Sequence, residues 1–227
     1  MSESDTPLHA IHLILEDHFG PLHWWPAQSP FEVVVGAILT QNTAWRNVEL
    51  AIANLRQADA LTIEALAQME RGPLELLIRP AGFFRQKAER LQWLAQHLAA
   101  EWNADVALFC AGELEETRRR LLSHKGIGPE TADSILLYAA QRPTFVVDAY
   151  TRRIFARLGL LAGDESYEAI RLLFTQQLPE EVALYNEYHA QIVNLAKSCC
   201  HKNRPLCSHC PLVSRCSHAT AEKQRTK

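Results

Sequence analysis

Four cysteines lie close together near the end of the 227-residue chain. Cys200, Cys207, Cys210 and Cys216 follow the spacing C-x6-C-x2-C-x5-C within seventeen residues. The segment that carries them is too short and polar to form a hydrophobic core, but four thiolates can wrap a metal centre that substitutes for one. Zinc is an alternative, although zinc ribbons usually present two C-x2-C pairs and only Cys207 and Cys210 form such a pair here. The tight, uneven spacing therefore favours a 4Fe–4S cluster.

A second chemical feature is a glycine-containing turn within residues 121–132, which reads as a helix, a tight turn and a new helix. Gly126 and Gly128 flank Ile127, and glycine permits backbone conformations that are closed to other residues. The amides of such a turn at a helix start form a site for a phosphate oxygen, which holds DNA without reading its sequence. Lys125, just before the turn, is expected to contact a phosphate as well. An ordinary helical hairpin is the alternative interpretation.

The third feature is a carboxylate about twenty residues beyond the turn. Asp148 follows an apolar run, residues 145–147, and precedes an amphipathic helix. As a helix N-cap it would be unremarkable. In a DNA-facing cleft, the same negative charge could stabilise the oxocarbenium-like sugar cation that forms when an N-glycosidic bond breaks, and it could orient the attacking water. With the hairpin upstream and the cysteines downstream, we interpret Asp148 as the catalytic residue.

The elements that must position these groups are helices. Residues 29–32, Ser-Pro-Phe-Glu, form a capping box with proline at the first helical position. The apolar run 33–39 could be a buried strand by composition, and only the capping box favours a helix. Further helices are expected from near Thr43, over 86–100 and over 182–200. The sequence therefore predicts an all-α protein.

Composition is that of an ordinary globular protein, with 48% hydrophobic and 22% charged residues. No apolar run approaches the roughly 20 residues that span a membrane, and the acidic, polar N-terminus does not resemble a secretory signal. We therefore expect a cytoplasmic protein, associated with the nucleoid in a bacterium or archaeon, whose cysteines are ligands rather than disulfides.

Charge is unevenly distributed. The net charge is −3, but residues 195–227 carry seven Lys or Arg and one acidic residue, which leaves −9 for the remainder. A basic C-terminal segment on an acidic body can still place positive potential along a phosphate backbone. On charge alone, a solvated basic tail is an equally good interpretation.

Hairpin, Val-Asp and four-cysteine loop, in this order, resemble the endonuclease III branch of the helix-hairpin-helix DNA glycosylases. The resemblance covers residues 30 to 216 and implies two helical lobes with DNA in the cleft between them and the target nucleotide flipped out. The expected segments are a lobe over 30–140 with its hairpin at 121–139, a second lobe from 1–29 and 141–199, a 4Fe–4S loop over 200–216, and a basic tail over 217–227.

The resemblance also assigns residues to the DNA interface. Gln41 matches the family residue that fills the vacated space in the duplex, and Phe83 matches the wedge beside it. Members that cleave the strand have a nucleophilic lysine just after the hairpin glycines, where this chain has Glu130. The resemblance therefore implies a monofunctional glycosylase that uses water and lacks strong strand cleavage.

A second resemblance, to bacterial 3-methyladenine DNA glycosylase III, suggests the substrate. It is carried by residues 24–26, 39–43, 79–80, 82–83, 86–88, 125–128 and 146–148. The base pocket it implies consists of Trp24, Trp25, Pro26, Trp45 and Lys197. Aromatic walls suit electron-poor alkylated purines. The chain departs from that family in carrying the cysteine loop and in having Gln191 where a second lysine is expected. Packing of the two tryptophans in a core is the alternative.

Other functions stay open from the sequence. One is an endonuclease III-type glycosylase for oxidised pyrimidines with weak or no strand cleavage, or an enzyme that removes adenine opposite a damaged guanine. Another is a non-catalytic iron–sulfur protein that binds DNA, and a third is a zinc-stabilised binding module. In each case DNA is the expected partner, no membrane is involved, and we expect a monomer.

Overall fold

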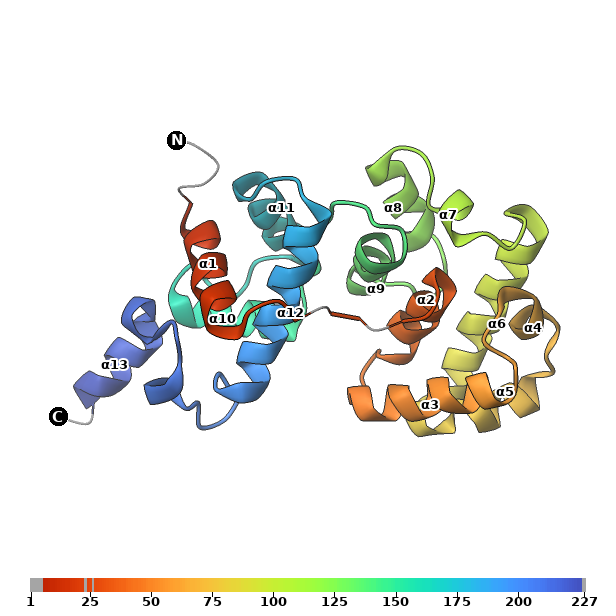
Figure 1. Cartoon of the computed structure of the whole chain (residues 1–227), viewed down its shortest axis with the longest axis horizontal. Coiled ribbons are helices and arrows are strands. Elements are labelled where there is room, and N and C mark those ends of the chain that lie inside the picture. The colour runs from red at the N-terminus through yellow and green to blue at the C-terminus, as the bar shows by residue number, and fades with distance from the viewer. Residues whose placement is uncertain (1–5, 23, 26, 226–227) are drawn as a thin grey trace. The chain divides into compact units, whose positions relative to one another are not determined.

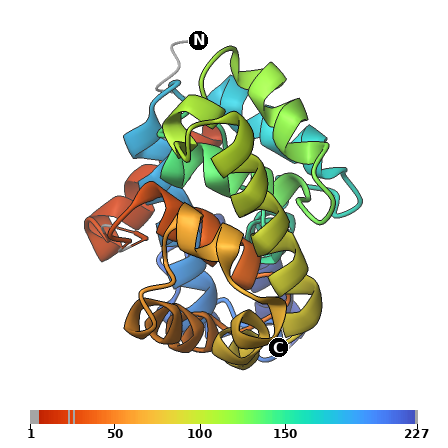
Figure 2. The same cartoon turned by 90° about the vertical axis from the view of Figure 1, so that its right-hand side faces the viewer.

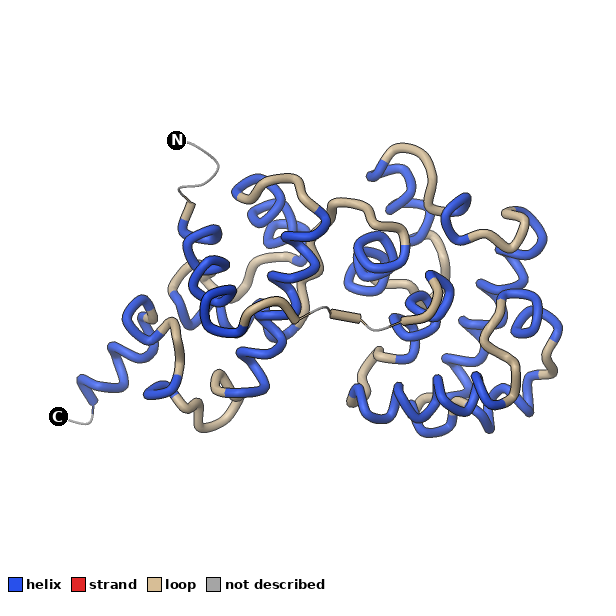
Figure 3. Tube along the Cα trace, viewed as in Figure 1, coloured by secondary structure: helices blue, strands red, loops and turns tan. Residues whose placement is uncertain are grey.

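The computed structural model describes residues 6–22, 24–25 and 27–225, with side chains through Ala221. Every regular element in this described part of the chain is a helix, as Figure 3 shows. The predicted all-α fold is thereby confirmed for these residues. No helix among them combines the length and apolar composition that a membrane span requires. The chain divides into two compact units, one formed by 25–142 and the other by 1–24 together with 143–227.

The unit formed by 25–142, here the middle unit, contains the helices labelled α2 to α9 in Figure 1. They are α2 (Pro30–Leu39), α3 (Trp45–Gln57), α4 (Ile63–Gln68), α5 (Arg71–Leu77), the 3₁₀ turn η2 (Arg79–Ala81), α6 (Phe84–Glu101), α7 (Val106–Phe109), α8 (Leu114–Leu122), α9 (Pro129–Ser134) and a π-helical turn, η3 (Ile135–Ala139). The long helix α6 packs against α4 and α5 (Figure 2).

Helix α2 is the core of the middle unit. The Ser29 hydroxyl accepts a hydrogen bond from the amide of Glu32 at 3.1 Å, so the helix starts at the predicted capping box. Every residue from Phe31 to Leu39 is buried, because a helix surrounded by other helices must be apolar on all faces. The run 33–39 is therefore helical, and its composition alone did not distinguish it from a strand.

The other unit, here the terminal unit, joins the N-terminal helix to the C-terminal half. Its elements are α1 (Pro7–Phe19), α10 (Ala149–Leu158), α11 (Tyr167–Gln177), α12 (Val182–Ser198), the 3₁₀ turns η4 (Cys207–His209) and η5 (Val213–Arg215), and α13 (Ser217–Arg225). Helix α13 occupies most of the segment expected as a basic tail.

Aromatic rings fill the terminal unit. Phe145 stacks on Phe174 with centroids 4.1 Å apart, and Phe174 meets Phe155 edge-on at 4.8 Å. The Tyr188 hydroxyl donates to the carbonyl of Leu8 at 2.8 Å, which connects α12 with α1. This core holds the start of α10 in place, and Asp148 is the residue directly before α10.

Candidate functional site

Asp148 is the N-cap of α10. Its Oδ1 accepts hydrogen bonds from the backbone N–H of Thr151 at 2.7 Å and from the Thr151 hydroxyl at 3.0 Å. The ordinary capping role is therefore real, and it leaves the second oxygen, Oδ2, facing His189 with 3.6 Å between Oδ2 and Nε2. Capping thus holds the carboxylate in one orientation rather than competing with a chemical role.

The carboxylate of Asp148 is ionised at neutral pH. Burial alone would raise its pKa, but His189 and the two donors of Thr151 hold the pKa below the usual value. Both side chains of the Asp148–His189 pair are largely buried. A fixed negative charge with few water contacts is the arrangement that stabilises a developing cation most strongly.

The hairpin runs from α8 through the turn to α9 (Figure 1). Gly126 has φ +89°, in the left-handed region, as the sequence predicts. Gly128 does not need glycine for its conformation: φ is −89° and an added Cβ would meet nothing within 4 Å. The prediction of a special backbone was therefore wrong at Gly128, because the chain there already runs extended into the helix.

Ile127 lies differently from the expected DNA contact. Its side chain is buried in the hydrophobic core, and its amide donates to the carbonyl of His124 at 3.0 Å. The side chain of Ile127 thus anchors the turn from inside. Lys125, in contrast, has 92% of its side-chain surface exposed and lies 3.7 Å from the carboxylate of Glu89.

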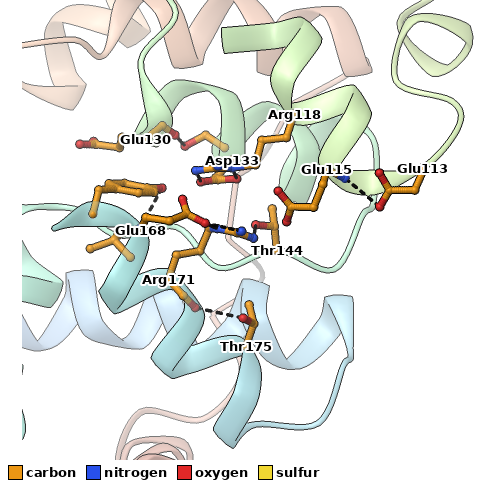
Figure 4. Close-up of polar contacts among 12 residues, drawn as sticks. Glu113, Glu115, Arg118, Glu130, Asp133, Thr144, Glu168, Arg171 and Thr175 are labelled. Atoms are coloured by element: carbon orange, nitrogen blue, oxygen red, sulfur yellow. Dashed lines mark hydrogen bonds and ion pairs between the residues drawn. The ribbon is translucent and has the colours of Figure 1, made fainter.

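A buried ion pair braces the two helices of the hairpin. Arg118 on α8 donates from Nε to Asp133 Oδ1 at 2.8 Å and from Nη2 to Oδ2 at 3.1 Å (Figure 4). Asp133 is fully buried and Arg118 nearly so. Two parallel bonds of this kind fix distance and angle together, so the pair determines how α9 leaves the turn.

Gln41 is hydrogen-bonded to the same turn. Its Nε2 donates to the carbonyl of Gly126 and to the hydroxyl of Thr131, each at 2.9 Å, and its Oε1 accepts from Arg90 Nη1 at 2.5 Å. The structure therefore brings together two residues predicted for the DNA interface, Gln41 and Gly126. Arg90 completes the arrangement from α6.

Lys87 connects the loop that carries Gln41 with the loop that carries Phe83. The side chain is 1% exposed, and Nζ donates to the carbonyl of Leu39 at 2.8 Å and to that of Ala81 at 2.9 Å. Burial, with a smaller contribution from the charge of Arg90, lowers the pKa of Lys87 to about 8. A neutral amine keeps two N–H groups, so both bonds can persist above that pH.

Phe83, unlike the buried Lys87, is exposed to solvent. It is 61% exposed and adopts a left-handed backbone conformation, with φ +46°, immediately before α6. An exposed phenylalanine on a strained backbone is consistent with a residue that inserts into a partner. Lys87 holds the segment that presents it.

Replacing Lys87 with methionine is expected to lower both stability and base release. Methionine removes both donors and leaves two carbonyls without partners, at a cost of about 1–3 kcal/mol in the free energy of unfolding. Thermal unfolding and a base-release assay check the two effects. Arg85→Met is the matched control, because Arg85 is on the same helix and 82% of its side-chain surface is exposed. Equal stability of the two variants would show that the hydrogen bonds of Lys87 do not hold these two segments together.

The predicted base-pocket residues fall into two groups. In the middle unit, Trp25 meets the Trp45 ring edge-on at 5.3 Å and lies against Tyr138 at 5.0 Å. Gly36 makes room for Trp25, because an added Cβ there would come within 3.0 Å of the indole. Tyr138 comes from the π-helical turn, a feature often found at functional sites. Pro26 lies outside the described residues.

The second group is in the terminal unit. The ammonium group of Lys197 lies over the Trp24 ring, 5.5 Å from its centroid. Lys197 is exposed, whereas the indole nitrogen of Trp24 is buried without a hydrogen-bond partner. The structure thus pairs Trp24 with Lys197, and Trp25 with Trp45.

Glu130 occupies the expected position directly after the turn. It is exposed in the first turn of α9, where a negative charge favours the helix start, and its carbonyl accepts from the Ser134 hydroxyl at 2.7 Å. A carboxylate cannot form a Schiff base with a sugar aldehyde.

The four cysteines of the predicted cluster line one cavity, together with Arg157, Cys199, Pro205, Val213, His218 and Ala219. Arg157 donates from Nη1 to Cys200 Sγ at 3.2 Å, and Cys216 Sγ lies 3.4 Å from the Arg157 carbonyl. Among the described residues, no three His, Cys, Asp or Glu are gathered tightly enough to hold a metal ion. Five cysteines therefore line this one cavity, the four of the predicted cluster and Cys199.

Several residues with clear roles in the geometry of the site could not be recognised from the sequence. His189, Tyr138, Lys87 and the Arg118–Asp133 pair are single polar or aromatic residues inside helices. Residues of these types are also common at surface and core positions without a functional role, so residue type alone did not mark them as part of the site. One signal was available: Lys87 lies in a helix on the side occupied by Ala88, Leu91 and Leu94, where a lysine is unusual.

Known proteins resemble this chain in sequence and in structure. Residues 35–180 match the HhH-GPD superfamily, described as base excision DNA repair proteins. A Methanocaldococcus jannaschii protein named as a candidate DNA repair glycosylase is 44% identical over 210 residues, covering 92% of this chain and 95% of the relative. Endonuclease III of Thermotoga maritima is 30% identical over 190 residues, covering 82% of each chain.

Among solved structures, the 3-methyladenine DNA glycosylase of Helicobacter pylori bound to 1,N6-ethenoadenine superposes with a TM-score of 0.73. It is 29% identical to this chain, and the match covers 83% of this chain and 96% of the other.

Proposed function

Because the chain belongs to the HhH-GPD superfamily of base excision DNA repair proteins, it is a DNA glycosylase, and we propose that it hydrolyses alkylated purines such as 3-methyladenine from DNA. The observation that carries the substrate assignment is the aromatic group Trp25, Trp45 and Tyr138. The Helicobacter relative, whose bound ligand is an alkylated adenine, supports the same assignment.

Alkylated purines suit such a site for two reasons. A methylated ring is electron-poor or cationic, and it is attracted to the electron-rich faces of indole and phenol rings. It is also a good leaving group, so the protein needs no acid to protonate the base. Half-buried Trp25 and Trp45 offer ring surface for stacking.

Asp148 supplies the charge that the reaction requires. As the bond between the sugar and the base breaks, positive charge develops on the sugar, and the ionised carboxylate stabilises it. The same carboxylate can accept a proton from the attacking water. His189 and Thr151 keep the carboxylate oriented, and they keep it ionised before the reaction begins.

The proposed enzyme is monofunctional. At the position where strand-cleaving relatives have their nucleophilic lysine, Glu130 offers no amine. Water is then the nucleophile, and the product is an intact strand with an abasic site. The hairpin, Lys125, Gln41 and Phe83 are proposed to hold the DNA and to fill the space that the flipped nucleotide leaves.

We propose that Cys200, Cys207, Cys210 and Cys216 hold a 4Fe–4S cluster. The fit rests on the donor set: these four cysteines line one cavity together with Cys199 and mostly apolar residues, and Arg157 donates to Cys200 Sγ. When bound, the cluster would supply the cross-link that this polar segment lacks in the absence of a core. Arg157 also donates to the carbonyls of His201 and Lys202, at 2.8 and 3.0 Å, and so orders the loop from α10.

The purified protein is expected to be brown, with broad visible absorption and about four iron atoms per chain for a 4Fe–4S cluster. Cys210→Ser is expected to lose the colour and much of the iron, whereas Cys110→Ser is expected to keep both, because Cys110 is buried in the middle unit and is not one of the four cysteines that line the cavity. Absorption spectra and metal analysis check both variants. A colourless protein that contains zinc would contradict the proposal.

The function is tested by incubating the protein with methylated DNA and separating released bases by chromatography. We expect free 3-methyladenine or 7-methylguanine, an intact DNA strand, and no borohydride-trapped protein–DNA adduct. Binding to DNA without release of either base would reject the alkylpurine assignment. A trapped adduct would reject the monofunctional mechanism and point to a lysine nucleophile.

A further inference from the structure

We propose that a groove beside the hairpin, here the α6 groove, binds the sugar–phosphate backbone of the DNA strand that the hairpin holds. The groove is in the middle unit and is lined by Gln86, Glu89, Arg90, Trp93 and Lys125. The inference extends the proposed function and rests on it in one respect, namely that DNA is the partner. It adds a second backbone contact to the one expected at the turn.

The α6 groove is continuous with the hairpin. Lys125 lines the groove and directly precedes Gly126 in the chain. Arg90 lines it too and lies against the turn: a Cβ added at Gly126 would fall 2.1 Å from Arg90 Nε. A strand that contacts the turn therefore passes within reach of the groove.

Trp93 provides a flat, rigid surface in the groove. The residue is 45% exposed. Its ring lies parallel to that of His97, with 5.6 Å between centroids and 7° between planes, and His124 meets it edge-on at 4.6 Å. A large exposed ring with rigid backing is typical of an interaction surface. Indole faces stack on the apolar faces of sugars and bases in bound nucleic acid.

The charges around Trp93 match a polyanion. Arg90 and Lys125 supply two cations, and Glu89 supplies one anion, 3.7 Å from Lys125 Nζ. Lys125 and Glu89 are both well exposed, so their attraction is weak. A phosphate can replace the Glu89 carboxylate as the partner of Lys125. A rigid aromatic face beside two cations thus fits the alternating sugar and phosphate groups of a DNA strand.

Hydroxyl-radical footprinting and affinity measurements on one duplex test the proposal. The duplex carries a tetrahydrofuran abasic-site analogue, so binding does not depend on base release or on the identity of the lesion. We expect Trp93→Ala to weaken binding about 5- to 100-fold and to expose one or two sugars that the natural protein protects. Trp93→Phe is expected to retain most of the affinity and the protection.

The charged residues give effects of opposite sign. Lys125→Gln is expected to weaken binding and to reduce the slope of log affinity against log salt by about one. Glu89→Gln is expected to strengthen binding, because it removes the competing carboxylate. Leu76→Ala is the control, since Leu76 is 67% exposed in α5 and does not line the groove.

Unchanged affinity and footprint for Trp93→Ala, with an unchanged circular dichroism spectrum, would overturn the proposal. Weaker binding by Glu89→Gln would do the same. The proposed function is tested separately, by base release. If the protein binds this duplex but releases no alkylpurine, the proposed function is rejected. The proposal for the α6 groove is then still tested by the footprint.

Discussion

Asp148→Asn is expected to reduce base release about 100- to 1,000-fold, while DNA affinity stays close to that of the natural protein and stability falls less than in Asp148→Ala. Asparagine removes the negative charge that stabilises the developing sugar cation. Its side-chain oxygen can still accept from the backbone and hydroxyl of Thr151, so the cap of α10 is retained. Chromatography of bases released from methylated DNA, under single-turnover conditions, measures the effect.

Asp148→Ala separates the two roles of the carboxylate. Alanine removes the charge and also the capping oxygen, which costs about 1 kcal/mol of stability. We therefore expect both variants to lose release, and the alanine variant to unfold at the lower temperature of the two. Base release by Asp148→Asn at the natural rate would show that another group carries the reaction.

The pH dependence follows from the lowered pKa of Asp148. A carboxyl group with a depressed pKa contributes stability above its unfolded-state pKa of about 3.9, and this contribution is lost as pH falls through the folded-state value. Protonation of Asp148 should therefore cause no loss of rate between pH 5 and 8. Any loss in that range must come from another group.

Asp133→Ala is expected to lower the free energy of unfolding by about 3–5 kcal/mol, the largest stability effect anticipated for this protein. Removing one partner of a buried pair leaves an uncompensated charge, and here it leaves the guanidinium of Arg118 without its bidentate acceptor. Thermal unfolding followed by circular dichroism should show a midpoint lowered on the order of 10 °C. DNA affinity should fall with it, because the pair orients the hairpin.

Two controls define the origin of that effect. Replacing both partners, as Arg118→Met with Asp133→Leu, is expected to recover most of the stability, since no buried charge remains. Glu89→Gln breaks an exposed ion pair in the same unit and is expected to change stability by less than about 1 kcal/mol. If Asp133→Ala costs no more than Glu89→Gln, the buried pair does not brace the hairpin.

Local features of this protein could be read from the sequence because their physics is local. The cap at Ser29 and the cap at Asp148 each need one side-chain oxygen and an amide three residues later, so residue type and spacing suffice. The left-handed Gly126 and the four-cysteine loop are likewise contained in short segments. The overall helical class follows from the same short-range patterns.

Other features depend on residues that are distant in the chain. His189 reaches Asp148 from α12, Tyr138 reaches Trp25 from a π-helical turn, and Lys87 connects two loops through backbone carbonyls. Backbone carbonyls have no sequence signature, so the partners of Lys87 could not be predicted. Contacts between aromatic rings depend on how the helices pack. Sequences with the same residue types can pack their helices in different ways, so these contacts could not be predicted from the sequence.

The sequence by itself determined where α2 and α10 start, where the hairpin turns, and which carboxylate and cysteines are available for chemistry. Only the tertiary structure decided that Ile127 is buried, that Gly128 has an ordinary backbone, and that Asp148 is held ionised by His189. The physical reason is range: hydrogen bonds within one turn are encoded by neighbouring residues, whereas burial and electrostatics depend on every segment that packs around a group.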